Sequence, residues 1–300
     1  MKPLRLGLIG AGPWGRNYIR TIVGLGGLQL TRVASRNPET ASFLPPGCRV
    51  VADWRELVRA DDVDALIVAA PPAAHAEIAL AAIDARRPVL IEKPLALDVP
   101  SAERVLSAAA ERGVPVMVDH THLFHPDYEA LKRAALERGP VRAIRAAAGG
   151  LGPYRADVGT LWDWGPHDVA MCLDLLGADP AAIEAELLES HPANGGRAER
   201  LRLSLLFAAG VRAEIELDTL RAKHRSFNVQ LDSGTLTYDG TPPPRAEDWP
   251  LARAVRAFAG SAAGGAGSLR SVELGVAVVR ILSRCEQRLS GNSPAAGRRA

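Results

Sequence analysis

Hydrophobic residues in the chain before His125 come in short continuous runs that alternate with amphipathic stretches. Continuous apolar runs are typical of strands buried on both faces, and the stretches between them have the period of helices. The alternation predicts an α/β domain, a parallel sheet with helices on both sides. The expected strands are Leu4–Ile9, Leu28–Ala34, Ala65–Ala70, Pro88–Ile91 and Pro115–Val118. The expected helices follow the first strand through about Val23 and then cover Trp54–Arg59, His75–Ala85 and Pro100–Arg112.

The pattern changes to strict alternation after His125-Pro126. Leu203 and Leu205 share one side of their strand, opposite Arg202, and this period of two is typical of a mainly antiparallel sheet with one covered face. The expected strands are Val141–Ala148, Ile183–Leu188, Leu201–Phe207, Val211–Leu217 and Arg225–Leu231. The expected helices are Asp127–Glu137, Gly165–Leu176, Leu251–Ala259 and Val272–Leu289.

A domain boundary is expected near residue 122, where the two patterns meet. Residues 1–122 would bind a dinucleotide, and residues 123–300 would form an α+β domain for substrate binding and oligomerisation, with the C-terminal helices packing on both. A Gly/Ala-rich link at Ser261–Gly267 and a loose basic tail are also expected. An open sheet leaves one face uncovered, and such a face, if apolar, is an expected oligomer interface.

The composition is that of a globular protein and excludes several classes of partner. Among 300 residues, 36 Lys and Arg against 34 Asp and Glu leave a net charge of only +2. Because this gives no broad basic field, we expect no nucleic-acid or membrane partner. Three scattered cysteines without a CxxC pattern are typical of free thiols in a reducing compartment. The start has no signal-peptide core and the most apolar window is broken at Pro71-Pro72, so a cytoplasmic protein is expected.

The first strand leads directly into the turn Gly10-Ala11-Gly12-Pro13-Trp14-Gly15, which opens a helix. In this context Gly10 permits the tight turn, Gly12 lets the backbone approach a pyrophosphate, and Gly15 lets the helix pack on the strand. The phosphates would lie at the helix N-terminus, where free N–H groups and the helix dipole favour anions. The alternative is a structural strand–helix turn without a ligand.

The end of the second strand bears on the choice of cofactor. An acidic residue there would bind the ribose 2′-hydroxyl of NAD, but the sequence has Ser35-Arg36-Asn37. Ser35 can donate a hydrogen bond to a 2′-phosphate, and Arg36 supplies charge and a planar face for adenine, so NADP is preferred over NAD. The alternative is that Arg36 is a solvated loop cation.

Two further clusters contain candidate catalytic residues. Glu92-Lys93-Pro94 follows a buried strand at the sheet edge where ligands bind, and Pro94 can form a cis bond that fixes the direction of Lys93. In the segment Trp162–Asp168, Gly165-Pro166 resembles a helix start. His167 would then lie in the first turn, where the dipole favours a neutral imidazole that accepts a proton, and Asp163 could orient it. The alternatives are a surface Glu–Lys pair and an ordinary capping or core histidine.

Taken together, these motifs resemble the glucose–fructose oxidoreductase, inositol dehydrogenase and MocA family over nearly the whole chain. The motifs are Gly10–Gly15, Pro71-Pro72 with His75, Glu92-Lys93-Pro94, and Asp163 with His167. The resemblance implies a Rossmann domain, a second domain built on an open sheet, a nicotinamide between them, and homodimers or homotetramers formed through that sheet. The residues expected to bind the cofactor are Gly10, Gly12, Pro13, Trp14, Gly15, Ser35, Arg36, Pro71, Pro72, His75 and Glu92.

The resemblance also bears on catalysis and substrate. Lys93, Asp163 and His167 correspond to the catalytic residues of the sugar and cyclitol dehydrogenases. The segments around Asp119–Pro126 and Asp157–Asp168 are most similar to those of members that act on nucleotide-linked sugars, although His122-Leu123 stands where an arginine is usual. The residues expected to contact the substrate are His122, Phe124, Asp157 and Trp162.

The resulting hypothesis is NAD(P)-dependent hydride transfer at a secondary alcohol or ketone carbon of a sugar, a nucleotide-linked sugar or a cyclitol. His167 and Lys93 would move the hydroxyl proton and stabilise the oxygen, in either assignment of the two roles. One alternative is a non-catalytic dinucleotide sensor of the same fold. Another is a metal-dependent enzyme that uses His120, His122 and His125, although no fourth ligand is evident from the spacing.

Overall fold

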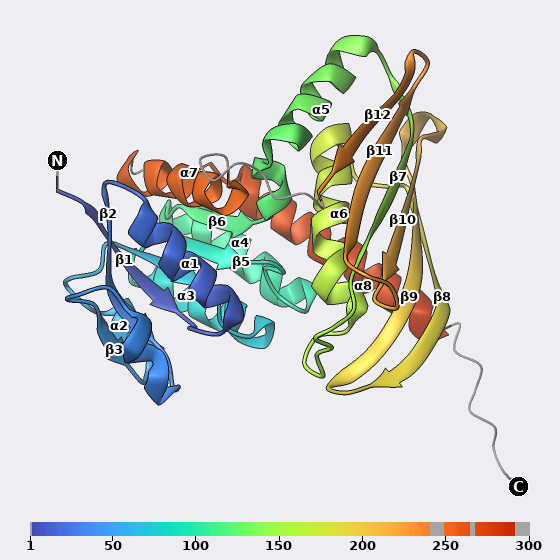
Figure 1. Ribbon diagram of the computed structural model, residues 1–300. Helices are drawn as coiled ribbons and strands as arrows, with labels where there is room; N and C mark the ends of the chain where they lie inside the picture. Colours follow the sequence, from blue (N-terminus) through green and yellow to red (C-terminus); the bar gives the residue numbers. More distant parts are fainter. Residues whose placement is uncertain (1, 241–248, 265–267, 292–300) are drawn as a thin grey trace, which may run out of the picture. The chain divides into compact units, whose positions relative to one another are not determined.

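The computed structural model describes residues 2–240, 249–264 and 268–291 (Figure 1). The chain forms two compact units. The first contains the residues up to His125, the helix α7 and the part of α8 that ends at Val279. The second starts at Pro126 and also contains α8 from Arg280 onward. The division of function between residues 1–122 and 123–300 stays a prediction.

The first unit is built on a six-stranded sheet in which every strand pair is parallel, in the order β3-β2-β1-β4-β5-β6. Every residue of β4 and β5 is buried, which explains why the sequence shows continuous apolar runs there. The α/β prediction is therefore confirmed. The strands are β1 (Leu4–Ile9), β2 (Leu28–Ala34), β3 (Arg49–Val51), β4 (Ala65–Val68), β5 (Val89–Glu92) and β6 (Val116–Asp119).

Helices cover both faces of this sheet (Figure 1). On one face, α1 and α7 pack together over Leu6, Leu8 and Leu30, with Tyr18 and Phe258 fully buried between helices and sheet. The helices are α1 (Pro13–Gly24), α2 (Trp54–Val58), α3 (His75–Asp84), α4 (Val99–Arg112), α7 (Pro250–Gly264) and the first part of α8 (Arg270–Gly291). Short 3-10 turns are η1 (Pro38–Phe43), η2 (Pro72–Ala74) and η3 (Thr121–Phe124).

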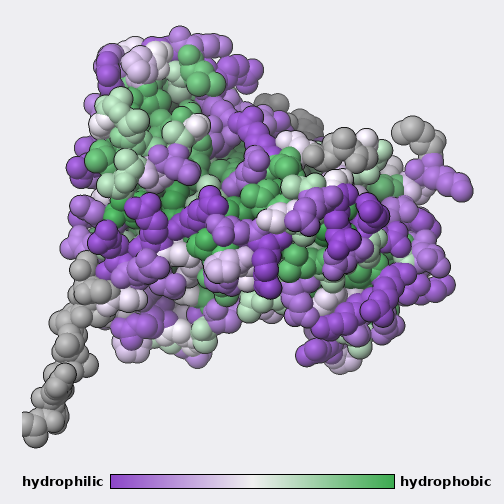
Figure 2. Space-filling model, turned by 180° about the vertical axis from the view of Figure 1, so that it is seen from behind, coloured by the Kyte–Doolittle hydropathy of each residue, from purple (hydrophilic) through white to green (hydrophobic). Residues whose placement is uncertain are grey.

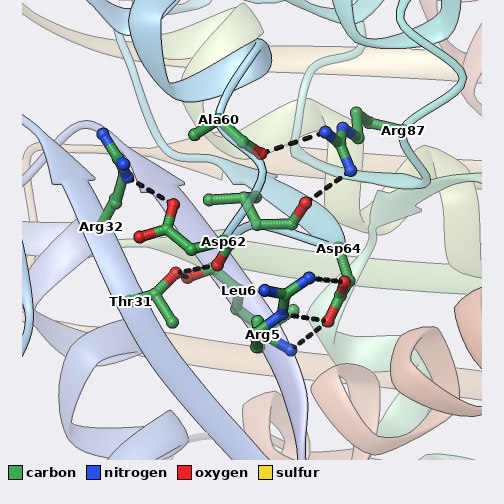
Figure 3. Close-up of polar contacts among 9 residues, drawn as sticks. Arg5, Leu6, Thr31, Arg32, Ala60, Asp62, Asp64 and Arg87 are labelled. Carbon is green, nitrogen blue, oxygen red and sulfur yellow. Dashed lines mark hydrogen bonds and ion pairs between the residues drawn. The ribbon is translucent and has the colours of Figure 1, made fainter.

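The loop that leads into β4 is held by arginines from neighbouring elements (Figure 3). Arg5 binds Asp64 through two hydrogen bonds of 3.0 and 2.7 Å, and Arg32 binds Asp62 at 2.6 Å. Arg87 donates to two carbonyl groups of the same loop. These arginines lower the pKa of both aspartates, so the contacts weaken as the pH falls. The network fixes the start of β4 beside β1.

The second unit contains a six-stranded sheet in the order β12-β11-β7-β10-β9-β8. Only β7 and β10 are parallel among its neighbouring strands in the described residues, so the prediction of a mainly antiparallel sheet is confirmed. The hairpin β8–β9 is longer than expected, and the edge strand β12 was not predicted. The strands are β7 (Val141–Gly149), β8 (Ala182–Ala193), β9 (Gly196–Leu206), β10 (Arg212–Asp218), β11 (His224–Leu231) and β12 (Gly234–Asp239).

One face of this sheet is covered by α5 (Pro126–Arg138) and α6 (Thr160–Leu176). The alternate residues of β9 and β10 that point away from the helices include Arg202 and Glu216, 3.9 Å apart, and Arg202 also lies 3.8 Å from Glu186. The outer face is therefore largely polar rather than apolar at these strands. Seen from behind, the surface is hydrophilic over much of its area, and hydrophobic residues gather at the upper left of the view (Figure 2). Assembly into homo-oligomers stays a prediction.

The C-terminal region is more helical than expected. The helix α7 continues to Gly264, so most of the predicted link at Ser261–Gly267 is helical where it is described. The rest of that link and the basic tail after residue 291 lie outside the described residues. Within the described part of the chain, no helix is both long and apolar enough to cross a membrane.

A buried ion pair ties α6 to the sheet of the second unit. Arg225 on β11 donates to Asp168 on α6 at 2.7 Å, and their side chains are 5% and 0% exposed. Removing one partner of such a pair leaves an uncompensated charge in a low-dielectric interior. The pair therefore holds α6, which carries Asp163 and His167, at one position on the sheet.

We predict that Arg225→Met lowers the free energy of unfolding by about 3–5 kcal/mol, because Asp168 would remain buried without its cation. Urea unfolding monitored by circular dichroism measures the loss. The double variant Asp168→Leu/Arg225→Met should recover part of it, since neither charge is then buried. Arg142→Met, which breaks an exposed pair with Asp232, is the matched control and should have far less effect. Equal losses in the two single variants would contradict the prediction.

Candidate functional site

The glycine turn between β1 and α1 leaves no room for side chains at two positions. Gly10 has a φ of +101°, and a β-carbon there would lie 2.4 Å from the carbonyl oxygen of Ala69. A β-carbon on Gly15 would lie 2.0 Å from the carbonyl oxygen of Gly10. Both distances are far below van der Waals contact, so the turn requires glycine at each position. The turn is thus pressed against the end of β4.

Gly12 differs from these two glycines because a β-carbon there would meet no described atom within 4 Å. It precedes α1, where Pro13 occupies the first position, and among the described residues no side chain caps the helix and no acidic residue lies in its first turn. The N–H groups of this turn and the open space at Gly12 fit the pyrophosphate of a dinucleotide. Pro13 and Trp14 are exposed at the same turn.

The end of β2 presents Ser35 and Arg36, as the cofactor prediction requires. The Ser35 hydroxyl accepts hydrogen bonds from the Asn37 N–H (3.2 Å) and the Thr40 hydroxyl (2.7 Å). Its own hydrogen remains available for an acceptor such as a phosphate oxygen. Arg36 is exposed beside it, and the Arg16 guanidinium lies 4.4 Å from the centroid of the Phe43 ring.

His75 is buried and links two backbone segments of the candidate site. Its Nδ1 lies 2.7 Å from the carbonyl oxygen of Pro94, and its Nε2 lies 2.8 Å from that of Ala70. Pro94 follows Lys93 through a cis peptide bond, the isomer that the sequence suggested. His75 therefore holds the residue after Lys93 near the end of β4, beside Pro71 and the buried Pro72. A direct contact of Pro71, Pro72 or His75 with the cofactor stays a prediction.

Glu92 and Asp119, the last residues of the neighbouring strands β5 and β6, form a buried acidic pair. The Tyr18 hydroxyl lies 2.7 Å from Glu92 and 2.5 Å from Asp119, and the Trp14 indole N–H donates to Glu92. Burial, followed by the charge of Asp119, raises the pKa of Glu92 to about 8. Burial raises the pKa of Asp119 to about 6. The partly buried Lys93 lies next in the chain, and its positive charge lowers the pKa of both acids.

Sequence reasoning missed Tyr18, and it named Asp119 only as part of the segment Asp119–Pro126, without a role of its own. The available signals were the spacing of four residues between Trp14 and Tyr18, which places them on one helix face, and the carboxylate at the end of β6. Their neighbour His120 and the nearby His125 are buried, whereas His122 and Phe124 on η3 are partly exposed. Over the described ranges, no group of three or more His, Cys, Asp or Glu side chains is arranged to hold a metal ion.

The start of α6 corrects one prediction. The helix begins at Thr160 after Gly159, and Pro166 lies inside it, so His167 is in its third turn and not the first. Gly165-Pro166 is therefore not a helix start, and the helix dipole gives no special reason for a neutral His167. The earlier start places Asp163 and His167 four residues apart on one helix face, where both are partly buried.

The other candidate substrate residues have partners within the second unit. Asp157 accepts two hydrogen bonds from Arg155 (3.1 and 2.7 Å), which lower its pKa, and Arg155 also lies 4.0 Å from Asp163. The buried Trp162 donates its indole N–H to Glu286 at 2.9 Å. Contact of Asp157, Trp162, His122 and Phe124 with a substrate stays a prediction, as does joint action of Lys93 with Asp163 and His167.

Known proteins match this chain in sequence and in structure. Residues 4–120 match the model of an oxidoreductase family with an NAD-binding Rossmann fold, GFO/IDH/MocA. Inositol 2-dehydrogenase 2 of Paenarthrobacter aurescens is 36% identical over 144 residues, which are 45% of this chain and 43% of that protein. The dTDP-3,4-didehydro-2,6-dideoxy-alpha-D-glucose 3-reductase of Actinomadura kijaniata is 31% identical over 252 residues, 78% of this chain and 74% of the reductase.

Structural similarity extends over both units. A crystal structure from Magnetospirillum magnetotacticum MS-1, of a protein assigned to the oxidoreductases, superposes with a TM-score of 0.87. It is 44% identical in sequence, and the match covers 95% of this chain and 100% of that chain. The match thus covers less than half of the inositol dehydrogenase, but the whole chain of this crystal structure.

We predict different effects for two alanine variants of the glycine turn, one on cofactor binding and the other on stability. Gly12→Ala should fold normally, because its β-carbon meets no described atom, but should weaken NADPH binding at least about tenfold by filling the pyrophosphate space. Gly15→Ala should lower the melting temperature, because its β-carbon clashes with the Gly10 carbonyl. Fluorescence titration and thermal unfolding measure the two effects. Unchanged NADPH affinity in Gly12→Ala would place the phosphates elsewhere.

Proposed function

Because the chain belongs to the GFO/IDH/MocA oxidoreductase family, we propose that it transfers a hydride between a nicotinamide dinucleotide and a secondary alcohol or ketone carbon of a sugar, nucleotide-linked sugar or cyclitol. The observation that carries this proposal is the glycine turn, whose open position at Gly12 lies at an uncapped helix start in the described structure. When bound, the nicotinamide supplies the two-electron redox chemistry.

The roles of the protein residues follow from their chemistry. His167 accepts the hydroxyl proton during oxidation and returns it during reduction, and Asp163, four residues earlier on α6, orients the imidazole or binds a neighbouring hydroxyl. Lys93 binds the reacting oxygen and stabilises its developing negative charge. His167 and Lys93 can also exchange these two roles. The contact of His75 with the Pro94 carbonyl supports a fixed position for Lys93.

The substrate class is supported by the relatives. One is an inositol dehydrogenase and the other a reductase of a dTDP-linked sugar, and both names describe rings that carry several oxygen atoms, hydroxyl groups in inositol and ketones in the dTDP-linked sugar. Such rings need polar partners, which Asp157, Asp163 and His122 can supply, and flat apolar surfaces such as Phe124 and Trp162. We further propose a homodimer or homotetramer formed through the second sheet, in the cytoplasm, where the three free cysteines stay reduced.

The cofactor proposed is NADP rather than NAD. Ser35 keeps a hydrogen to donate, Arg36 is exposed next to it, and no carboxylate occupies either position. A 2′-phosphate would gain charge-assisted hydrogen bonds from both side chains. NAD lacks this phosphate, so only its ribose hydroxyls could form hydrogen bonds with Ser35 and Arg36.

Arg36→Ala should weaken NADPH binding about tenfold and leave NADH binding nearly unchanged, because only NADPH carries the 2′-phosphate. Titration of protein fluorescence with each nucleotide measures both dissociation constants. The exposed Arg59, after α2 in the same unit, gives the control variant Arg59→Ala. Comparable affinity of the wild-type protein for NADPH and NADH would overturn the preference.

Lys93→Met should lower kcat/KM about a hundredfold, equivalent to about 3 kcal/mol of transition-state stabilisation, without unfolding the protein. The assay is NADPH formation or consumption, after a screen of polyols, sugars and nucleotide sugars and native mass spectrometry of the purified protein for bound ligand. The exposed Lys2 provides the control Lys2→Met. Unchanged turnover would remove Lys93 from the mechanism, and bound cofactor without turnover on any substrate would favour a sensor.

A further inference from the structure

The acidic pair Glu92 and Asp119, at the ends of β5 and β6, takes part in more hydrogen-bond contacts than the neighbouring side chains have hydrogens to donate. Glu92 Oε1 is contacted by the Trp14 indole N–H and by the Tyr18 hydroxyl. Asp119 Oδ2 is contacted by the same Tyr18 hydroxyl, and Asp119 Oδ1 accepts from Thr121 at 3.0 Å. These are four contacts between electronegative atoms, but Trp14, Tyr18 and Thr121 provide one hydrogen each. The remaining contact needs a hydrogen from a carboxyl group.

The surroundings of the pair favour such a protonated carboxyl group. Glu92 and Asp119 lie directly opposite each other on neighbouring parallel strands, and both are buried, as is Tyr18. Two adjacent carboxylates in a low-dielectric interior repel each other strongly, so one proton is retained between them. Lys93 is the cation that acts on both acids, and it follows Glu92 directly. The raised pKa values of both acids agree with this geometry.

We propose that Glu92 and Asp119 share one proton through the Tyr18 hydroxyl, and that this protonated cluster positions the glycine turn, through Trp14, beside the strand end that carries Lys93. Glu92, Asp119 and Tyr18 are thus positioning residues rather than catalytic residues. The positioning role deepens the proposed function and rests on it, whereas the shared proton is a property of the folded chain alone. The cluster joins α1, β5 and β6 at one corner of the first unit.

The shared proton has a defined consequence for stability. A carboxyl group whose pKa is raised by folding stabilises the protein at low pH, and this contribution is lost as the pH rises through the folded pKa. For this pair the loss occupies the pH window that starts near the ordinary pKa values of the two acids, 3.8 and 4.5, where the unfolded chain ionises, and ends at about 8. Above that window, both acids are ionised, and one of the four contacts has no hydrogen.

The test compares the wild-type protein with Glu92→Gln by thermal unfolding near pH 4 and above pH 8. The introduced amide cannot ionise and carries its own hydrogens, so we expect the variant to be less stable than wild type at low pH and to close or reverse that gap at high pH. Glu111→Gln, on the exposed side of α4, is the matched control and should show a constant gap. A gap for Glu92→Gln that does not change with pH would overturn the shared proton.

Infrared spectroscopy gives an independent measurement on the cofactor-free protein. A protonated carboxylic acid has a C=O stretching band that a carboxylate lacks. We expect such a band in the wild-type protein near neutral pH, its loss above pH about 8, and its loss or shift in Glu92→Gln and in Asp119→Asn. Absence of any pH-dependent band of this kind in the wild-type protein would also overturn the shared proton.

Cofactor binding then tests the positioning role. Glu92→Ala removes the acceptor for the Trp14 indole and should weaken NADPH binding about tenfold, whereas Glu92→Gln, which keeps an acceptor oxygen, should restore much of the affinity. Equal affinities in the two variants would show that Glu92 does not position the turn. If the wild-type protein binds no NADPH, the proposed function and the positioning role fail, while the stability and infrared measurements still decide whether a proton is shared.

Discussion

The close approach between the first strand–helix turn and the end of β4 sets the geometry of the first unit. Only a hydrogen fits at Gly10 and Gly15, so the turn packs directly on the backbone of Ala69 and on itself. This contact fixes where α1 begins, and with it the direction of its first two turns. Trp14 and Tyr18 are consequently held over Glu92 and the neighbouring strand end. The same constraint therefore shapes both the phosphate site and the buried acidic cluster.

Buried polar groups hold the functional segments of both units in place. In the first unit, the imidazole of His75 lies within hydrogen-bond distance of two carbonyl oxygens, that of Ala70 after β4 and that of Pro94 after β5. In the second unit, the ion pair between Asp168 and Arg225 joins α6, the helix that carries His167, to β11. Buried polar groups of this kind are stable only when nearly every partner is present, so they confine the backbone to one arrangement. The proposed hydride transfer needs such confinement, because the reacting groups must be held in one geometry.

Much of the fold could be predicted from the sequence because continuous and alternating apolar patterns distinguish parallel from open antiparallel sheets. The edge strands β3 and β12 were missed because nearly all of their residues are exposed or partly exposed, so they lack the continuous apolar run that marks buried strands such as β4. The start of α6 was misplaced because Gly165-Pro166 looks locally like a helix start, while packing of the preceding residues extends the helix to Thr160. Tyr18 looked like an ordinary core residue, because its two acidic partners lie 74 and 101 residues away.

The polar networks at the two ends of the parallel sheet have opposite responses to acid. At the end where β4 begins, Arg5 and Arg32 bind ionised aspartates, and protonation dissolves those pairs. At the other end, protonation completes the contacts of the Glu92 cluster. Lowering the pH from above 8 toward 6 therefore completes the contacts at the corner that carries Lys93, whereas the arginine–aspartate pairs at the base of the sheet stay intact until the pH falls below the ordinary aspartate pKa of 3.8.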